Sequence, residues 1–471
     1  MNSLDLARWQ FGLTTLLHFA IVGISIGLVL HVAVMQTRWQ RTGDERWLRL
    51  TRFYGKLMLL SFAVGVATGL LQTFQFGMNW SRFSAYVGDV FGAPLALEGL
   101  GAFFVEAVFL GLWMFGWGRL PRRLHLACVW IVAGAAVLSA YAILVANTWM
   151  QHPTGYRLVD GHAQLTNVLP VLFNLNIALT TAHVLFGALL AGTLIVLAVA
   201  ALQLLRGRDA EVFRPVVAMG VKVGLVAALG AATFGHFQGM LATQQQPMKM
   251  AAAEALYDTE SPAGLSLFAL GGVSTDPGRL ILDVKLPVAL SFLNTFSFDS
   301  TVQGINRLQA AAEERYGPGD YTPVVGLMYW SFRLMVGSGT ALIGLLAFGV
   351  WLLWRGALFD SRRFLRVLLL AATLPFVAQA GGWILREGGR QPWIVEGLLR
   401  TDVANSPNVG VVAVALSLGA YLAFYAIAFF FAGRVAAHEV REGLEGAHSV
   451  VDLPGAGAPG RRSSADLALT Y

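Results

Sequence analysis

Two glutamates lie in a stretch that is otherwise apolar and long enough to cross a membrane. Glu98 and Glu106 belong to the segment from Phe91 to Trp117, which reads FGAPLALEGLGAFFVEAVFLGLWMFGW. Ionisable side chains at membrane depth are rare, and as a rule they face a protein interior, a cavity or a bound group. On a regular α-helix the two carboxyls differ by roughly 12 Å in depth and roughly 80° in direction. The pair is either two steps of one proton path or two protonated side chains hydrogen-bonded inside a helix bundle.

Further side chains that can bind metal ions share the depth of the first glutamate. Counted from the outer ends of the helices predicted below, the residues within about ten positions of a helix end are His18, Glu98, His183, Met335 and Glu387. At ~1.5 Å per residue all five lie within the outer third or so of the membrane, whereas the second glutamate of the pair is deeper. Five helices therefore contribute such side chains to one layer.

Histidine, methionine and carboxylate are the residue types that coordinate haem iron, and a His/Met pair is characteristic of low-spin electron-transfer haems. Each residue alone has an ordinary explanation, because a lone histidine is commonly a hydrogen-bonded structural residue and a lone methionine fills a core. Their common depth favours a joint interpretation as ligands. The single cysteine, Cys128, lies in an apolar run. Disulfides within the chain, CxxCH haem attachment and cysteine-ligated iron–sulfur clusters are therefore excluded.

The other histidines show no such pattern. His31 follows His18 on the same predicted helix, but no other helix repeats this spacing. His125 lies at a cytoplasmic helix end. We assign no chemistry to either. His236, near the outer end of the sixth predicted helix, stays open between a structural and a functional role.

Composition identifies the elements that must position these residues. The chain has 471 residues, of which 56% are hydrophobic and 13% are charged, against about 25% charged in soluble domains. This composition predicts an all-α, polytopic integral membrane protein. The formal net charge is +6, but the arginines cluster in short segments between apolar runs, as topology determinants do. We therefore exclude a role in nucleic-acid binding.

Taking about 20 apolar residues as one crossing, we predict about nine transmembrane helices. They are placed at residues 10–37, 52–79, 92–117, 124–149, 176–204, 213–240, 325–354, 364–385 and 408–433. Arginine-rich segments fall at every second connection, so the positive-inside rule places those segments and the C-terminus in the cytoplasm and the N-terminus outside.

These spans divide the chain into four parts. Helices one to six occupy residues 1–240, an extracytoplasmic loop residues 241–324, helices seven to nine residues 325–433, and a disordered cytoplasmic tail residues 434–471. The loop opens with QQQPMKMAAAEALYDTE, in which Pro247 can start a helix that the following residues favour. The tail contains PGAGAPGRRSS from Pro454 to Ser464, a composition typical of disorder.

Several segments of the chain are similar to sequence motifs of a known family. They are RWQFGLTTLLHF around His18, GAPLALEGLGAFFVE around Glu98 and Glu106, ILVANTWMQHPTG from Ile143 to Gly155, WSFRLMVGSG around Met335, and REGGRQPW from Arg386 to Trp393. On these segments the chain resembles subunit I of the cytochrome bd-type quinol oxidases over nearly its whole length, excluding the tail. The QQQPMKMAAAE segment resembles the quinol-binding loop of that family in its shorter form.

The resemblance implies roles for the residues that match. His183 and Met335 would be the axial ligands of a low-spin haem b. His18 and Glu387 would serve two high-spin haems, one b-type and one d-type. The resemblance does not decide which residue serves which haem. Glu98 would stand at the high-spin pair and Glu106 on the proton route into it. In the loop, Lys249 and Glu254 would take part in quinol oxidation, although on a helix they point roughly 140° apart. Arg333 and Arg390 would pair with haem propionates, because an arginine close to the bilayer needs a counter-charge.

The resemblance also implies the reaction and its setting in a bacterial inner membrane. Membrane quinol would be oxidised at the outer loop, and dioxygen would be reduced to water with protons taken from the cytoplasm. This arrangement would generate a proton-motive force without a pump. The expected partners are a second large membrane subunit, small single-helix subunits and the lipid bilayer.

Two other classes of function remain open on the residues alone. A transmembrane haem protein that is not an oxidase, either an electron carrier or a sensor, would use the same ligands but only in six-coordinate haem. A transporter would use Glu98 and Glu106 as proton-coupled sites and would hold no haem.

Overall fold

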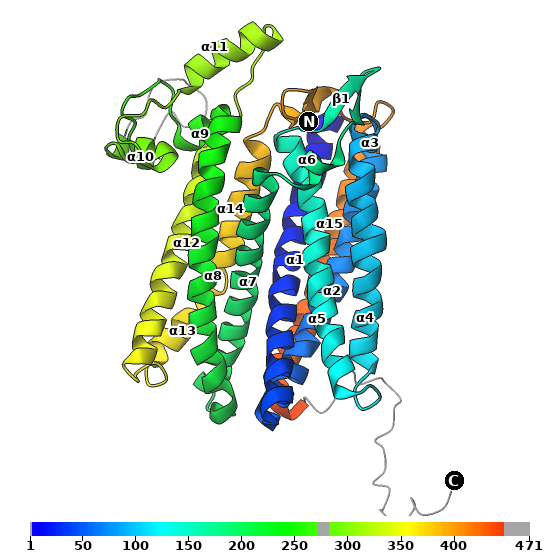
Figure 1. Cartoon of the computed structure of the whole chain (residues 1–471), viewed down its shortest axis with the longest axis vertical. Coiled ribbons are helices and arrows are strands. Elements are labelled where there is room, and N and C mark those ends of the chain that lie inside the picture. The colour runs from blue at the N-terminus through cyan, green and yellow to red at the C-terminus, as the bar shows by residue number, and fades with distance from the viewer. Residues whose placement is uncertain (1, 271–281, 447–471) are drawn as a thin grey trace, which may run out of the picture.

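The computed structural model describes residues 2–270 and 282–446. Within these residues, nine helical spans are long and apolar enough to cross a membrane, and they form one bundle of long helices (Figure 1). The predicted fold class, an all-α polytopic membrane protein, is confirmed. The N-terminus lies at the same end of the bundle as α9 and α11, while α15 ends at the opposite side (Figure 1).

The helices are α1 (Ser3–Thr42), α2 (Glu45–Met78), α3 (Ser81–Ala96), α4 (Phe104–Phe115), α5 (Arg122–Gln151), α6 (Val168–Leu172), α7 (Leu175–Leu205), α8 (Ala210–Gln245), α9 (Pro247–Glu254), α10 (Ala289–Thr295), α11 (Ile305–Tyr316), α12 (Val325–Trp354), α13 (Arg362–Ala371), α14 (Leu374–Gly388) and α15 (Val411–Glu442). A π-helical segment, η1 (Leu97–Phe103), joins α3 to α4, and short 3-10 turns occur at η2 (Thr401–Val403) and η3 (Gly443–Gly446). The described part of the chain contains three antiparallel strand pairs, called hairpins below: β1 (Tyr156–Val159) with β2 (His162–Leu165), β3 (Leu265–Leu270) with β4 (Leu282–Leu286), and β5 (Trp393–Val395) with β6 (Leu399–Arg400).

Several helices are longer than the apolar runs that predicted them. α1 begins at Ser3 because Asn2 and Asp5 form a capping box, in which each side chain accepts a hydrogen bond from the other residue's backbone N–H. Such caps satisfy backbone donors that the helix leaves unpaired. The helix at Pro247 is confirmed as α9, with the proline at its first position.

The C-terminal boundary of the last span was predicted wrongly. α15 continues past Gly433 to Glu442, so residues 434–442 are helical and not disordered. Contacts with neighbouring helices hold this end: Glu439 forms an ion pair with Lys56 at 3.1 Å, and the Val440 carbonyl accepts a hydrogen bond from Gln203. The predicted disordered segment from Pro454 to Ser464 lies outside the described residues.

Two predicted single helices are interrupted. The span predicted at 92–117 starts at Ser81 and passes through η1 before α4. The span predicted at 364–385 divides into α13 and α14, with Pro375 in the first turn of α14. Proline is accepted in a first turn because the backbone N–H there has no partner within the helix.

The centre of the bundle is α1, which packs against α2, α5, α7, α14 and α15. Its closest approach is to α7, where a Cβ built on Gly192 would lie 2.5 Å from the Cα of Gly27. The two backbones therefore touch at this crossing, as small residues permit in membrane proteins. His31 lies near the crossing and uses both ring nitrogens, one with the Gly27 carbonyl and one with Thr193.

We predict that Gly192→Val destabilises the protein, because a side chain at this position must separate α1 from α7. Overpacking of this kind costs about 1–3 kcal/mol. The measurement is the thermal midpoint of the purified protein in detergent. The matched control is Gly134→Val on α5, where nothing lies within 4 Å of the added Cβ. Equal midpoints for the two variants would contradict the predicted backbone contact.

Candidate functional site

Glu387 lies at the end of α14 inside a network of polar side chains from α5. Its Oε1 accepts hydrogen bonds from Asn147 at 2.7 Å and from Gln151 at 3.3 Å, and its Oε2 forms an ion pair with Arg390 at 2.5 Å. Arg386 donates to the Oδ1 of the same asparagine at 2.6 Å. The carboxylate is therefore held by two amides from the C-terminal end of α5 and by an arginine.

Lys249 extends this network from α9 in the long loop. Its Nζ donates to the Oε1 atoms of Gln151 at 2.5 Å and Gln246 at 2.6 Å. Each glutamine then donates through its Nε2 to a carboxylate, Gln151 to Glu387 and Gln246 to Glu396 at 2.9 Å. Two amides thus connect one buried ammonium group to two carboxylates. Burial lowers the pKa of Lys249 to about 7, and burial raises the pKa of Glu396.

Glu254, at the other end of α9, belongs to a separate cluster. Its Oε2 forms an ion pair with Arg333 of α12 at 2.7 Å, and both side chains are largely buried. Arg333 also donates to the carbonyls of Ala253 and Ser266 and lies over the ring of Tyr329. Burial raises the pKa of Glu254 to about 7, although the arginine opposes the shift. Lys249 and Glu254 therefore face different partners, in agreement with their predicted difference in direction.

The ion pair between Glu254 and Arg333 removes the reason for which Arg333 was predicted to pair with a haem propionate. Arg333 was expected to pair with a haem propionate because it needs a counter-charge, and Glu254 provides that charge. Arg390 differs, because its Nε and Nη1 atoms are buried and have no hydrogen-bond partner among the described residues. Buried donors without partners are costly, so Arg390 has two donors available for an acidic ligand.

His18 and His183 each leave one ring nitrogen available. The Nδ1 of His183 donates to the Ala231 carbonyl at 2.8 Å. The Nδ1 of His18 donates to the hydroxyl of Thr68 at 2.9 Å, which itself donates to a backbone carbonyl. In both rings the Nε2 atom then carries a lone pair that has no hydrogen-bond partner among residues 2–270 and 282–446. This is the state of a metal-ligating imidazole.

The buried histidines to which we assigned no chemistry have no free nitrogen. His125 accepts from Gln36 at its Nδ1 and donates from its Nε2 to the Trp113 carbonyl, both at 2.8 Å. His31 is also bonded at both nitrogens. The hydrogen bonds thus distinguish His18 and His183 from His31 and His125.

Met335 packs against Gly381 and Gly382 of α14, so α12 and α14 approach closely at the sulfur atom.

The two membrane glutamates lie around the π-helical segment. Glu98 is within η1 and accepts a hydrogen bond from Ser139 at 3.1 Å. A π-helical turn contains more residues than an α-helical turn, so each residue rotates the chain less and the expected separation of roughly 80° decreases. The segment therefore brings Glu106 nearer to the helix face that carries Glu98.

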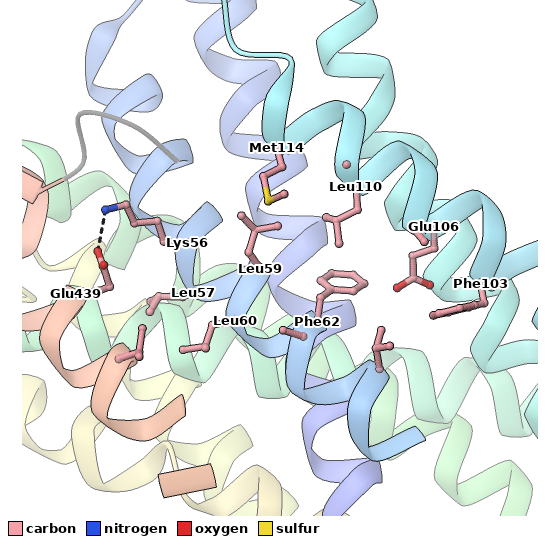
Figure 2. Close-up of a pocket in the computed structure, with 15 residues that line it drawn as sticks. Lys56, Leu57, Leu59, Leu60, Phe62, Phe103, Glu106, Leu110, Met114 and Glu439 are labelled. Carbon is pink, nitrogen blue, oxygen red and sulfur yellow. Dashed lines mark ion pairs between the residues drawn. The ribbon is translucent and has the colours of Figure 1, made fainter. Parts of the chain in front are cut away.

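Glu106 lines a cavity of about 690 Å³ between α2, α4 and α15. The Lys56–Glu439 ion pair lies at one end of the cavity and Glu106 lies toward the other, with mostly apolar side chains between them (Figure 2). An ionisable group in the third span is thus connected by open space to a charged pair near the end of α15.

The candidate ligands occupy a thicker layer than the sequence indicated. Glu98 contacts Ser139 and Glu387 contacts Asn147, both on α5. These two α5 residues are eight positions apart, which corresponds to roughly 12 Å along the helix. The predicted depths were counted from helix ends taken from the apolar runs. Those ends were wrong, because α1 and α3 begin well before their predicted starts.

Sequence reasoning did not single out Asn147, Gln151, Gln246 or Glu396. Amides give no periodic signal, and Glu396 lies on the β5–β6 hairpin beyond any predicted helix. One signal was available: Asn147 and Gln151 are polar residues four positions apart in the apolar helix α5, which places them on one face.

Comparison with known proteins identifies the family of the chain. The family model for cytochrome bd terminal oxidase subunit I matches residues 6–444. Cytochrome bd ubiquinol oxidase subunit 1 of Bacillus subtilis is 42% identical over 446 residues, which cover 94% of this chain and 95% of the relative. Cytochrome bd-II ubiquinol oxidase subunit 1 of Escherichia coli is 35% identical, with 86% and 90% covered.

A solved structure agrees as well. The bd oxidase from Geobacillus thermodenitrificans superposes with a TM-score of 0.85 at 27% identity, covering 94% of this chain and 99% of that chain. Neither a transporter nor a haem protein without oxidase function fits these matches. With nine spans in its described part and a family match from residue 6 to residue 444, the chain belongs to subunit I of the cytochrome bd terminal oxidases, haem-containing membrane enzymes of bacterial respiration that work with a second subunit.

Proposed function

We propose that this subunit oxidises membrane quinol at its long loop and reduces dioxygen to water in the bundle. The observation that carries the proposal is the pair of imidazoles, His18 and His183, whose Nε2 atoms are left free by hydrogen bonds at Nδ1. A reduced-minus-oxidised absorption spectrum of the purified complex, with oxygen consumption on added quinol, tests it. A spectrum without high-spin haem, or no quinol-dependent oxygen uptake, would refute it.

The residues fit the haem groups of this family. His183 and Met335 would hold a low-spin haem b, and His18 and Glu387 would serve a high-spin haem b and a haem d. Arg390 would support a propionate, because its buried Nε and Nη1 atoms have no hydrogen-bond partner in the described part of the chain. When bound, the haems transfer electrons and reduce dioxygen. The protein supplies the ligands, their orientation and the protons.

The two ends of α9 have different proposed roles. Glu254 accepts a proton from the quinol hydroxyl, and Arg333 keeps the carboxylate in place. Lys249 is bonded to two amides in a buried site, so it fixes α9 against α5 and α14 and thereby positions the loop. Glu396 balances its charge through Gln246.

The proposed proton route runs from the cytoplasmic side. The N-terminus and the loop lie outside, and α15 ends in the cytoplasm, in accordance with the arginine distribution. Protons enter near the Lys56–Glu439 pair, pass along the cavity to Glu106 and continue to Glu98. Uptake from one side and release of quinol protons on the other generate a proton-motive force.

Met335→Leu should remove the low-spin haem signal or convert it to high spin, because leucine preserves volume but lacks the sulfur ligand. The measurement is the reduced-minus-oxidised spectrum. Met328→Leu is the matched control, since Met328 is a fully buried methionine on the same helix outside the ligand set. An unchanged low-spin spectrum in Met335→Leu would remove this residue from the ligands.

Glu254→Ala should lower quinol oxidation at least tenfold with haem content intact, because the proton acceptor is lost. Glu260→Ala is the control, as it removes a more exposed loop carboxylate that pairs with Lys285. With a pKa of about 7 for Glu254, the accepting carboxylate increases with pH. Wild-type kcat/KM for quinol should therefore rise between about pH 6 and pH 8. Near-normal turnover in Glu254→Ala would place the substrate site elsewhere.

Glu106→Gln should keep the haems and normal dioxygen binding, because glutamine preserves shape and hydrogen bonding. It cannot relay a proton by ionising, so steps that need proton uptake should slow at least tenfold, ~1.4 kcal/mol in barrier. Single-turnover kinetics with a pH indicator dye would measure both rates. Wild-type turnover with normal proton uptake would make this glutamate structural.

A further inference from the structure

The long loop exposes large apolar side chains although it lies outside the membrane spans. In its described part, the β3–β4 hairpin exposes Leu267, Phe268, Leu270, Leu282, Val284 and Leu286, and α10 with the residues that follow it exposes Leu293, Phe296 and Phe298. Phe296 is 54% exposed and Phe298 is 62% exposed. We call these nine residues the loop apolar surface. Contiguous apolar surfaces of this kind mark binding regions.

Contacts between α10 and α8 give the depth of this surface. The ring of Phe296 lies 5.6 Å from the ring of His236, and Thr243 of α8 donates to Asn294 at 3.4 Å. His236 precedes the end of α8 at Gln245 by nine residues, or roughly 14 Å. The end of α10 therefore lies well below the end of the spanning helix, beside the bundle (Figure 1).

The β3–β4 hairpin has the same relation to α12. Ser266 forms a hydrogen bond with the hydroxyl of Tyr329 at 2.8 Å, and the Phe268 ring contacts Trp330 at 5.6 Å. Both partners lie in the first two turns of α12. The hairpin thus flanks the beginning of a spanning helix and does not stand above it.

The loop apolar surface continues into exposed apolar side chains of the spanning helices. Next to it, α12 exposes Leu327 and Trp330, its N-cap residue Val324 is also exposed, and α8 exposes Phe237. By contrast, α11 carries exposed charged residues such as Glu313 and Glu314 and lies farther from the bundle (Figure 1). The loop is therefore apolar where it flanks the spans and charged where it points away from them.

We infer that α10 and the strands β3 and β4 are embedded in the headgroup region of the phospholipid bilayer, with Phe296 and Phe298 reaching the upper acyl chains. The occupant of the loop apolar surface is lipid, because the surface is continuous with the exposed apolar belt of the spanning helices α8 and α12. Aromatic side chains are enriched at this depth in membrane proteins. The loop is then anchored at the bilayer and at the bundle, which places α9 at the height from which a membrane-dissolved molecule arrives.

The test uses the complete oxidase complex carrying Phe298→Cys, labelled with an environment-sensitive fluorophore and reconstituted in phosphatidylcholine nanodiscs. Doxyl groups near the top of the acyl chains then quench the label. The matched control is Glu313→Cys on α11, and the complex without added cysteine measures background labelling. We expect quenching at position 298 to exceed that at position 313 at least threefold.

Equal quenching at the two positions would overturn the inference, because the surface would then stand in water. Failure to label Phe298→Cys in the assembled complex would also overturn it, since a protein partner would then cover the surface. If Phe298→Cys does not assemble, Leu293→Cys reports on the same surface and is judged by the same two outcomes.

Discussion

A charge withdrawn from water must find a partner, and this requirement organises the end of the bundle that carries the long loop. Glu387 and Arg386 of α14, Arg390 in the turn after it and Lys249 of α9 are brought together with amides from α5. Removing one member of such a buried set leaves the others without compensation, which is more destabilising than the loss of a surface pair. The buried charges of the loop and of the helix bundle therefore compensate one another.

The same requirement explains why the loop has two polar clusters and not one. Glu254 and Arg333 join α9 to α12, while Lys249 joins α9 to α5 and, through the amides, to α14. A helix of eight residues is too short to be stable in isolation. Its two ends are each fixed by an ionic or charge-assisted contact, so α9 is held by tertiary interactions.

Apolar runs and arginine positions were sufficient to predict the all-α class and the spans, because membrane insertion depends on those same properties. The helix ends were less predictable. The capping box of α1 and the contacts that extend α15 to Glu442 depend on polar residues outside the apolar runs. The metal-binding residue types were recognisable, but the amides Gln151 and Gln246 and the carboxylate Glu396 were not. Their significance arises only when α5, α9 and the β5–β6 hairpin meet.

The π-helical segment from Leu97 to Phe103 makes the backbone conformation of the third span a determinant of its chemistry. If the same residues followed a regular α-helix, each step would turn the chain further, and Glu106 would point roughly 80° away from Glu98. Its identity and its neighbours in sequence would be unchanged. The winding of the helix between the two glutamates is thus as consequential as their identity, and a relative that kept both residues at this spacing in a regular α-helix would not present the same pair.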